Sequence, residues 1–206
     1  MSSQTGAAVA VQPKRERGKQ RVQELLAAGG AVFAEKGYDA ATMTEIAARA
    51  GAPIGSLYQF FPSKESLADT LVQNYVSLLT ADLQALEAQG QDLSTADLIE
   101  ALFGVLRAHP HERAATLPLA EARMDERTRR ETFRYVLRRH IASILRARSP
   151  ALSAEAARDC AIVVLQLMKA ASSLSDEESL SGRATAIREL QTMAVSVVTR
   201  GETGSK

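Results

Sequence analysis

The polar side chains best suited to chemistry lie between residues 42 and 64. Thr42 and Thr44 place hydroxyls at the start of a predicted helix, where hydroxyls and backbone amides suit phosphate oxygens, and Thr44 can alternatively reach a base. Ser56 and Gln59 lie on a second predicted helix, and the amide of Gln59 matches N6 and N7 of adenine. These residue types and spacings indicate contacts with DNA and no catalytic group.

Two further residues of the second helix fit this interpretation. Ile54 can pack on a thymine methyl group, and Gly55 allows the backbone to approach DNA closely.

A basic run precedes these residues, although the net charge of the chain is only +1. We expect the run to contact phosphates or the minor groove, and a solvated charged tail is the alternative. The run contains a single acid, Glu16, and its basic residues are Lys14, Arg15, Arg17, Lys19 and Arg21.

Local signals predict how the polar residues are held. Thr42 and Glu45 have the spacing of a capping box, so a helix begins here, and Gly51 can take the positive φ that ends it. Pro53 fits the first position of a second helix over residues 54–60. Two short helices with a glycine-containing turn are typical of a helix-turn-helix, whose second helix enters the major groove.

Many proteins that do not bind DNA contain such turns, so the surrounding sequence matters. It resembles the tetracycline-repressor (TetR) family of transcriptional regulators from about Arg21 to Leu67, about a quarter of the chain. The matching positions are Phe33 to Tyr38, Thr42, Ile46-Ala47, Ala50-Gly51, Gly55 to Tyr58, Phe61 and Ser63 to Glu65.

The resemblance implies that Tyr58 and Lys64 contact phosphates, in place of a partly buried tyrosine and a solvated lysine. Two positions depart from the family pattern. Pro53 replaces the usual Ser or Thr, which removes a side-chain cap, and Phe60 stands where Tyr or His is common. Both changes leave the operator sequence open.

The elements around this unit follow from helical periodicity. A first helix is predicted over residues 19–36, where Gly29-Gly30 favour close packing against a neighbour and Gly37 ends the helix. After Ser63, a helix reaching about Gln89 spans about 40 Å and can join a second domain. The predicted small core comprises Phe33, Tyr38, Ile46, Leu57 and Phe61.

The remaining pattern is helical throughout, so the predicted fold class is all-α. Helices are expected over residues 94–108, 111–124, 125–148, 153–173 and 180–200. The predicted divisions are a disordered tail at 1–13, a helix-turn-helix DNA-binding domain at 14–67, and an effector-binding and dimerisation domain at 68–206.

The resemblance implies two sites in the second domain. An effector pocket would be lined by Phe103, Leu106, Leu117, Phe133, Leu137 and Met168, although the same spacing also suits plain core. TetR-like regulators dimerise through their last two long helices, which gives an interface of Val164, Leu167, Ile187, Leu190, Ala194 and Val197. One monomeric core is the alternative.

Other functions find little support in the sequence. It contains none of the common hydrolase, nucleotide-binding or metalloprotease motifs, and no cofactor or metal site is predicted. A turn is favoured over a metal site for His109-Pro110-His111, and the only cysteine, Cys160, is expected to be buried and inert. No apolar stretch approaches the ~20 residues that span a membrane, so a cytoplasmic protein is expected.

The sequence therefore predicts a homodimeric repressor that leaves a palindromic operator in double-stranded DNA when a small-molecule effector binds. The alternatives are a TetR-like accessory DNA-binding protein without an effector and, more remotely, an enzyme. The effector, the operator, the regulated genes, activation as opposed to repression, and the number of dimers per operator are not written in the sequence.

Overall fold

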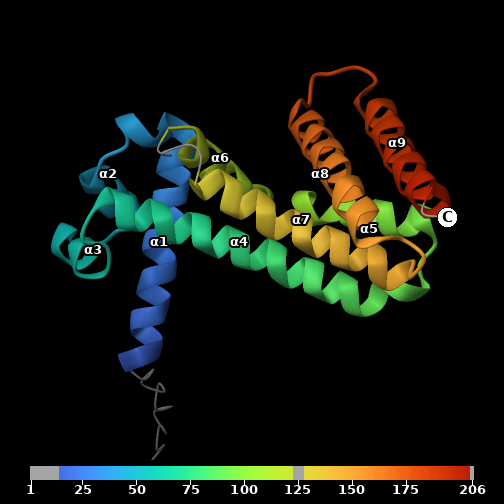
Figure 1. Ribbon diagram of the computed structural model, residues 1–206. Coiled ribbons are helices and arrows are strands. Elements are labelled where there is room, and N and C mark those ends of the chain that lie inside the picture. Colours follow the sequence, from blue (N-terminus) through green and yellow to red (C-terminus); the bar gives the residue numbers. More distant parts are fainter. Residues whose placement is uncertain (1–13, 123–127, 205–206) are drawn as a thin grey trace, which may run out of the picture.

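The computed structural model describes residues 14–122 and 128–204, and the predicted disordered tail at 1–13 lies outside them. Within these ranges the elements are helices, which confirms the all-α prediction (Figure 1). The α-helices are α1 Lys14–Ala40, α2 Met43–Arg49, α3 Ile54–Phe60, α4 Lys64–Gln89, α5 Thr95–Arg107, α6 Pro110–Ala122, α7 Thr128–Arg148, α8 Ala154–Asp176 and α9 Arg183–Gly204.

Several helix boundaries differ from expectation, and α9 was expected over residues 180–200. Helix α1 begins at Lys14 instead of Lys19, so the basic run is helical where the structure describes it. A short 3-10 helix, Gly90–Asp92, separates α4 from α5 and was not predicted. Gly37 interrupts the helical geometry of α1 as expected, because its φ is +76°.

The turn between α2 and α3 is built largely as predicted. The Thr42 hydroxyl accepts from the Glu45 amide, and the Glu45 carboxylate accepts from the Thr42 amide, both at 3.2 Å. Gly51 has a φ of +58°. Pro53 is the N-cap of α3 instead of its first residue, because its ψ of 139° is extended while its carbonyl already accepts from the Ser56 amide at 2.9 Å.

The predicted small core is confirmed, since Phe33, Tyr38, Ile46, Leu57 and Phe61 are all buried in one cluster. This N-terminal cluster also contains Leu67 of α4 and Leu119 of α6. Helix α6 therefore packs on the DNA-binding unit although it lies far away in the sequence.

The two glycines of α1 permit this packing. A Cβ added to Gly29 would lie 2.5 Å from Leu67 Cδ2, and one added to Gly30 would lie 3.0 Å from the Ala115 Cβ. The close packing predicted for Gly29-Gly30 is thus made against α4 and α6.

Helix α4 continues from the N-terminal cluster into a second and larger core (Figure 1). Tyr75, Leu79 and Leu83 of α4 are buried there among α5, α7, α8 and α9. Leu78, which precedes Leu79 in the same helix, is 36% exposed. One helix thus contributes to both cores.

Cys160 lies in this core as expected. Its thiol donates to the Val197 carbonyl at 3.7 Å, and burial raises the pKa of the thiol. Fewer thiolates form at neutral pH, so Cys160 is a poor nucleophile. Among the described helices, none combines the length and apolar character needed to cross a membrane.

The packing of Gly29 gives a stability prediction. Gly29→Val should lower the free energy of unfolding by about 1–3 kcal/mol, because the new side chain would collide with buried Leu67. Urea unfolding followed by circular dichroism measures the change. Gly18→Ala on the same helix is the control: nothing lies within 4 Å of a Cβ added at Gly18, so the change should stabilise by about 0.5–1 kcal/mol. Equal stability of Gly29→Val and the parent chain would contradict this account of α1.

Candidate DNA interface

Helix α3 buries one residue and exposes the rest of its surface. Leu57 is fully buried, whereas Ile54 is 40% and Tyr58 49% exposed, and Gly55 and Gln59 are also exposed. Ser56 is half-buried. Exposed apolar side chains grouped on one short helix mark an interaction surface. This surface combines a methyl-bearing side chain, a phenol and an amide, which suit thymine methyls, phosphates and base edges respectively.

Phe60 extends this surface, since its side chain is 37% exposed. The sequence interpretation treated it only as a lost polar contact. Nothing in the sequence around Phe60 indicated that its side chain would be exposed.

Thr42 and Thr44 at the start of α2 are both exposed, but their hydroxyls are not equally free to bind DNA. The Thr42 hydroxyl donates to the Glu45 carboxylate at 3.0 Å while accepting from the Glu45 amide. A hydroxyl has one hydrogen, so the capping box occupies the donor that a phosphate would need. The predicted phosphate contact of Thr42 therefore competes with the capping box, whereas Thr44 lies on the exposed side of the first turn.

Lys64 differs most clearly from its predicted role. Its amino group donates to the carbonyls of Tyr38 at 2.8 Å, Asp39 at 3.2 Å and Ala41 at 2.9 Å, and lies 4.4 Å from the centre of the Tyr38 ring. An ammonium has three hydrogens, and all three are used within the chain. Lys64 thus ties the start of α4 to the end of α1, and its predicted phosphate contact would compete with these three carbonyls.

Two ion pairs hold α1 against α2. Both terminal nitrogens of Arg49 donate to the Glu35 carboxylate, which lowers the pKa of Glu35 and raises the pKa of Arg49. Lys36 donates to Glu45 at 2.6 Å, and this bond is the largest cause of the lowered pKa of Glu45. The sequence interpretation missed both pairs, since nothing local couples residues so far apart in the chain.

The basic run is exposed where its side chains are described. Arg17 and Lys19 are both exposed, and Lys19 pairs with Glu16 at 3.0 Å. The side chains of Lys14 and Arg15 lie outside those that the structure describes. Exposed pairs of this kind contribute little, so Lys19 can exchange its partner for a phosphate.

The predicted effector residues meet in the larger core where they are described. Phe103, Leu106, Leu137 and Met168 are all buried in one apolar cluster. The side chains of Leu117 and Phe133 are outside the described set. These side chains of α5, α7 and α8 form part of the larger core, and an effector pocket among them stays a prediction.

The predicted dimer residues divide into two groups. Val164 and Ala194 are 0% exposed in the single chain, which corrects their assignment to an intersubunit surface, because they pack α8 against α9. Leu167 and Val197 line an open groove between these helices, and Ile187 and Leu190 are half-buried against the core.

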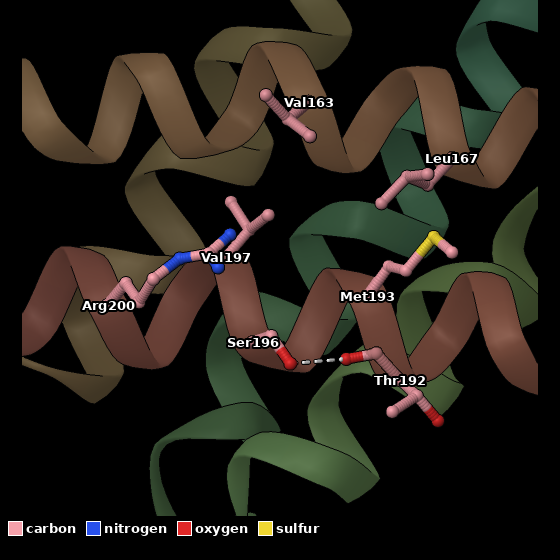
Figure 2. Close-up of a pocket in the computed structure, with 7 residues that line it drawn as sticks. All are labelled: Val163, Leu167, Thr192, Met193, Ser196, Val197 and Arg200. Carbon is pink, nitrogen blue, oxygen red and sulfur yellow. Dashed lines mark hydrogen bonds between the residues drawn. The ribbon is translucent and has the colours of Figure 1, made fainter.

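Figure 2 shows the groove and the residues that the sequence interpretation missed. Val163 of α8 and Met193 of α9, 41% and 53% exposed, lie along it together with Arg200. Val163 and Met193 each lie one position before a predicted interface residue, Val164 and Ala194, that is buried instead.

The histidine turn makes an intrachain contact. His109 Nε2 lies 2.7 Å from Asp82 Oδ2, which links the start of α6 to α4. Over residues 14–122 and 128–204, no group of three metal-ligating side chains comes together.

Comparisons with known families agree with this geometry. The profile described as bacterial regulatory proteins, tetR family, matches residues 25–71, and the profile described as tetracyclin repressor-like, C-terminal domain, matches residues 92–196. The second match covers about half of the chain.

Individual relatives match less of the chain. The HTH-type transcriptional repressor KstR2 of Mycobacterium tuberculosis is 39% identical over 85 residues, 41% of this chain and 40% of that protein. The HTH-type transcriptional activator FasR of Mycolicibacterium smegmatis is 42% identical over 65 residues, 32% of this chain and 30% of that protein. The chain thus spans at most about two fifths of the curated relatives it matches.

A solved structure extends the likeness to the whole fold. The crystal structure of a tetR-family regulatory protein from Rhodococcus RHA1 has a TM-score of 0.66 with 20% identity, and the match covers 87% of this chain and 97% of that one. At this identity the likeness concerns the fold.

The contacts of Lys64 give a prediction that separates two roles. Lys64→Met should lower the free energy of unfolding by about 1–2 kcal/mol, because three carbonyls lose their donor. The slope of log binding constant against log salt concentration should stay unchanged, whereas loss of a phosphate contact would reduce its magnitude by about 0.9. Titrations of a DNA duplex at several salt concentrations measure the slope.

Arg17→Met is the matched control for this measurement, since Arg17 is an exposed cation of the basic run. Its slope should fall while its stability stays within about 0.5 kcal/mol of the parent. A lower slope for Lys64→Met at unchanged stability would restore Lys64 as a phosphate contact.

Proposed function

The chain belongs to the TetR family of bacterial regulatory proteins, and from this premise we propose that it is a DNA-binding transcriptional repressor released by a small molecule. The observation that carries the proposal is the exposed face of α3, where Ile54, Tyr58 and Gln59 project from a helix anchored by buried Leu57. Repression follows from occupancy of the operator. The choice of repression over activation rests on the likeness to KstR2, which is described as a repressor, whereas FasR is described as an activator.

The DNA-binding residues in this proposal fall into two kinds. Thr44, Ile54, Ser56 and Gln59 read base edges, with Gly55 allowing close approach, while Tyr58 and the basic run bind phosphates. The protein would act in the cytoplasm, where bacterial DNA lies.

The functional unit is proposed to be a homodimer formed through α8 and α9. The support is the exposed apolar groove of Val163, Leu167, Met193 and Val197 between them. A second copy related by a two-fold axis covers the same surface on both chains, which is the commonest arrangement of soluble dimers. The operator is then palindromic, with half-sites about one DNA turn, ~34–36 Å, or a multiple of it apart.

Effector binding is proposed to act through α6. This helix contributes Leu119 to the N-terminal cluster, packs Ala115 against Gly30 of α1, and reaches α8 through Arg113. A molecule bound among Phe103, Leu106, Leu137 and Met168 changes the packing on which the position of α6 depends. Coupling is reciprocal, so DNA must weaken effector binding by the same free energy by which the effector weakens DNA binding, typically ~1–3 kcal/mol.

Base preference tests the DNA-binding proposal. Selection of duplexes from a random pool by the full chain should yield a palindrome, and Gln59→Ala should change preference at one base pair of each half-site by ~1–3 kcal/mol. Gln91→Ala, an exposed glutamine beyond the far end of α4, is the control and should leave the selected sequence unchanged. A pool with no enriched sequence would refute the proposal.

The oligomeric state tests the proposed interface. Val163→Glu should convert the dimer to a monomer in sedimentation equilibrium, because the carboxylate would be buried against its own copy across the interface. Leu180→Glu is matched in exposure, since both native side chains are 41% exposed, but lies in the α8–α9 connection and should leave the dimer intact. A dimeric Val163→Glu protein would move the interface elsewhere.

A further inference from the structure

A buried polar cluster lies where α4, α6 and α8 meet. Arg113 of α6 has a side chain that is only 11% exposed, yet its guanidinium reaches α8. One terminal nitrogen donates to the Ser172 carbonyl at 3.3 Å, and the other donates to the Asp176 carboxylate. Arg113 thus bridges the helix that packs on the DNA-binding unit to a helix of the larger core.

Two polar atoms of this cluster have no hydrogen-bond partner within the described part of the chain. They are Arg113 Nε and Ser172 Oγ, and both are buried. A buried donor without an acceptor destabilises the fold, so such a group in a native protein calls for a partner such as water, an ion or a ligand. Both atoms can donate, and they belong to residues in contact, since the Arg113 guanidinium also donates to the Ser172 carbonyl.

The polar cluster borders the apolar core. Ser172 lies one helical turn after Met168, so the two side chains share a face of α8 and both are buried. The charges of Arg113, Glu112 and Asp176 also act on Tyr75 of the same core, and burial raises the pKa of this tyrosine to about 12. A molecule here would have a polar end at Arg113 and Ser172 and an apolar body toward Met168.

The charges around the cluster select the chemistry of the polar end. The Arg113 cation is already paired with Asp176, and Glu112 is a second nearby carboxylate. An added anion would face two carboxylates against one cation, whereas an uncharged acceptor meets no such repulsion. A carbonyl oxygen has two lone pairs and therefore satisfies both donors at once.

We propose that Arg113 Nε and Ser172 Oγ hold the carbonyl oxygen of an uncharged, largely apolar effector, such as a ketone, lactone or ester. This inference rests on the proposed function, because it names the chemical class of the molecule that releases DNA. Binding draws the Arg113 guanidinium toward Ser172 and so displaces α6, which packs against Gly30 of α1.

The test uses the full chain and 2-decanone labelled with carbon-13 at the carbonyl. In the parent protein the carbonyl stretch should move to lower frequency on binding, because the oxygen accepts two hydrogen bonds. Ser172→Ala and Arg113→Lys each remove one donor, and Lys keeps the charge that pairs with Asp176. Each should weaken binding by about tenfold or more and shift the stretch back toward its value in an apolar solvent.

Matched controls separate this role from general damage to the fold. The control variants are Ser175→Ala and Arg148→Lys. The Ser175 hydroxyl donates to the Ala171 carbonyl, and Arg148 donates to Glu202 and to the Leu93 carbonyl. Both should bind 2-decanone as the parent does. If Arg113→Lys fails to fold, Ser172→Ala alone decides the outcome, since it only removes an oxygen.

Three results would overturn the inference. They are the absence of 2-decanone binding to the parent, equal binding and equal carbonyl frequency in Ser172→Ala, or tighter binding of decanoate than of 2-decanone. Operator binding without ligand is measured in parallel on the same samples. If the parent does not bind the operator, the proposed function is refuted. If it binds the operator and any of the three results is found, only the carbonyl site is refuted.

Discussion

The close packing of α1 against α4 and α6 is the constraint on which the rest of the structure depends. Gly29 and Gly30 leave no side chain between the helices, so Leu67 and Ala115 approach the α1 backbone directly. Without this approach, Leu119 could not join the N-terminal cluster. The DNA-binding unit is therefore held by one helix from its own sequence neighbourhood and by one from the second domain.

This arrangement explains why several polar groups near α3 serve the scaffold. Lys64 satisfies carbonyls at the end of α1, where helix geometry leaves them without amide partners. The Tyr38 hydroxyl donates to Glu65 at 2.8 Å, and the capping box fixes the start of α2. With these contacts in place, α3 needs only Leu57 for anchorage and can expose nearly all its other side chains.

The sequence predicted what depends on local geometry. Capping spacings, the positive φ of Gly51 and the bounds of α3 follow from a few neighbouring residues, and they were found where expected. The intrachain role of Lys64 was missed because its three acceptors lie more than twenty positions earlier in the chain. Val164 and Ala194 were misassigned because helical periodicity identifies an apolar stripe without telling whether the same chain or a second copy covers it.

Arg113 and Ser172, which the sequence did not single out, are able to couple the DNA-binding unit to the larger core. A ligand shifts a conformational equilibrium only by its differential affinity for the two states. Apolar contacts in a well-filled core change gradually with small displacements, whereas a hydrogen bond to a buried donor is lost within a fraction of its length. Arg113 Nε and Ser172 Oγ come from helices α6 and α8, so a single acceptor can satisfy both only at one separation of these helices. Leu119 of α6 also packs in the N-terminal cluster, so a fixed separation of α6 and α8 also fixes the position of the helix that packs on the DNA-binding unit.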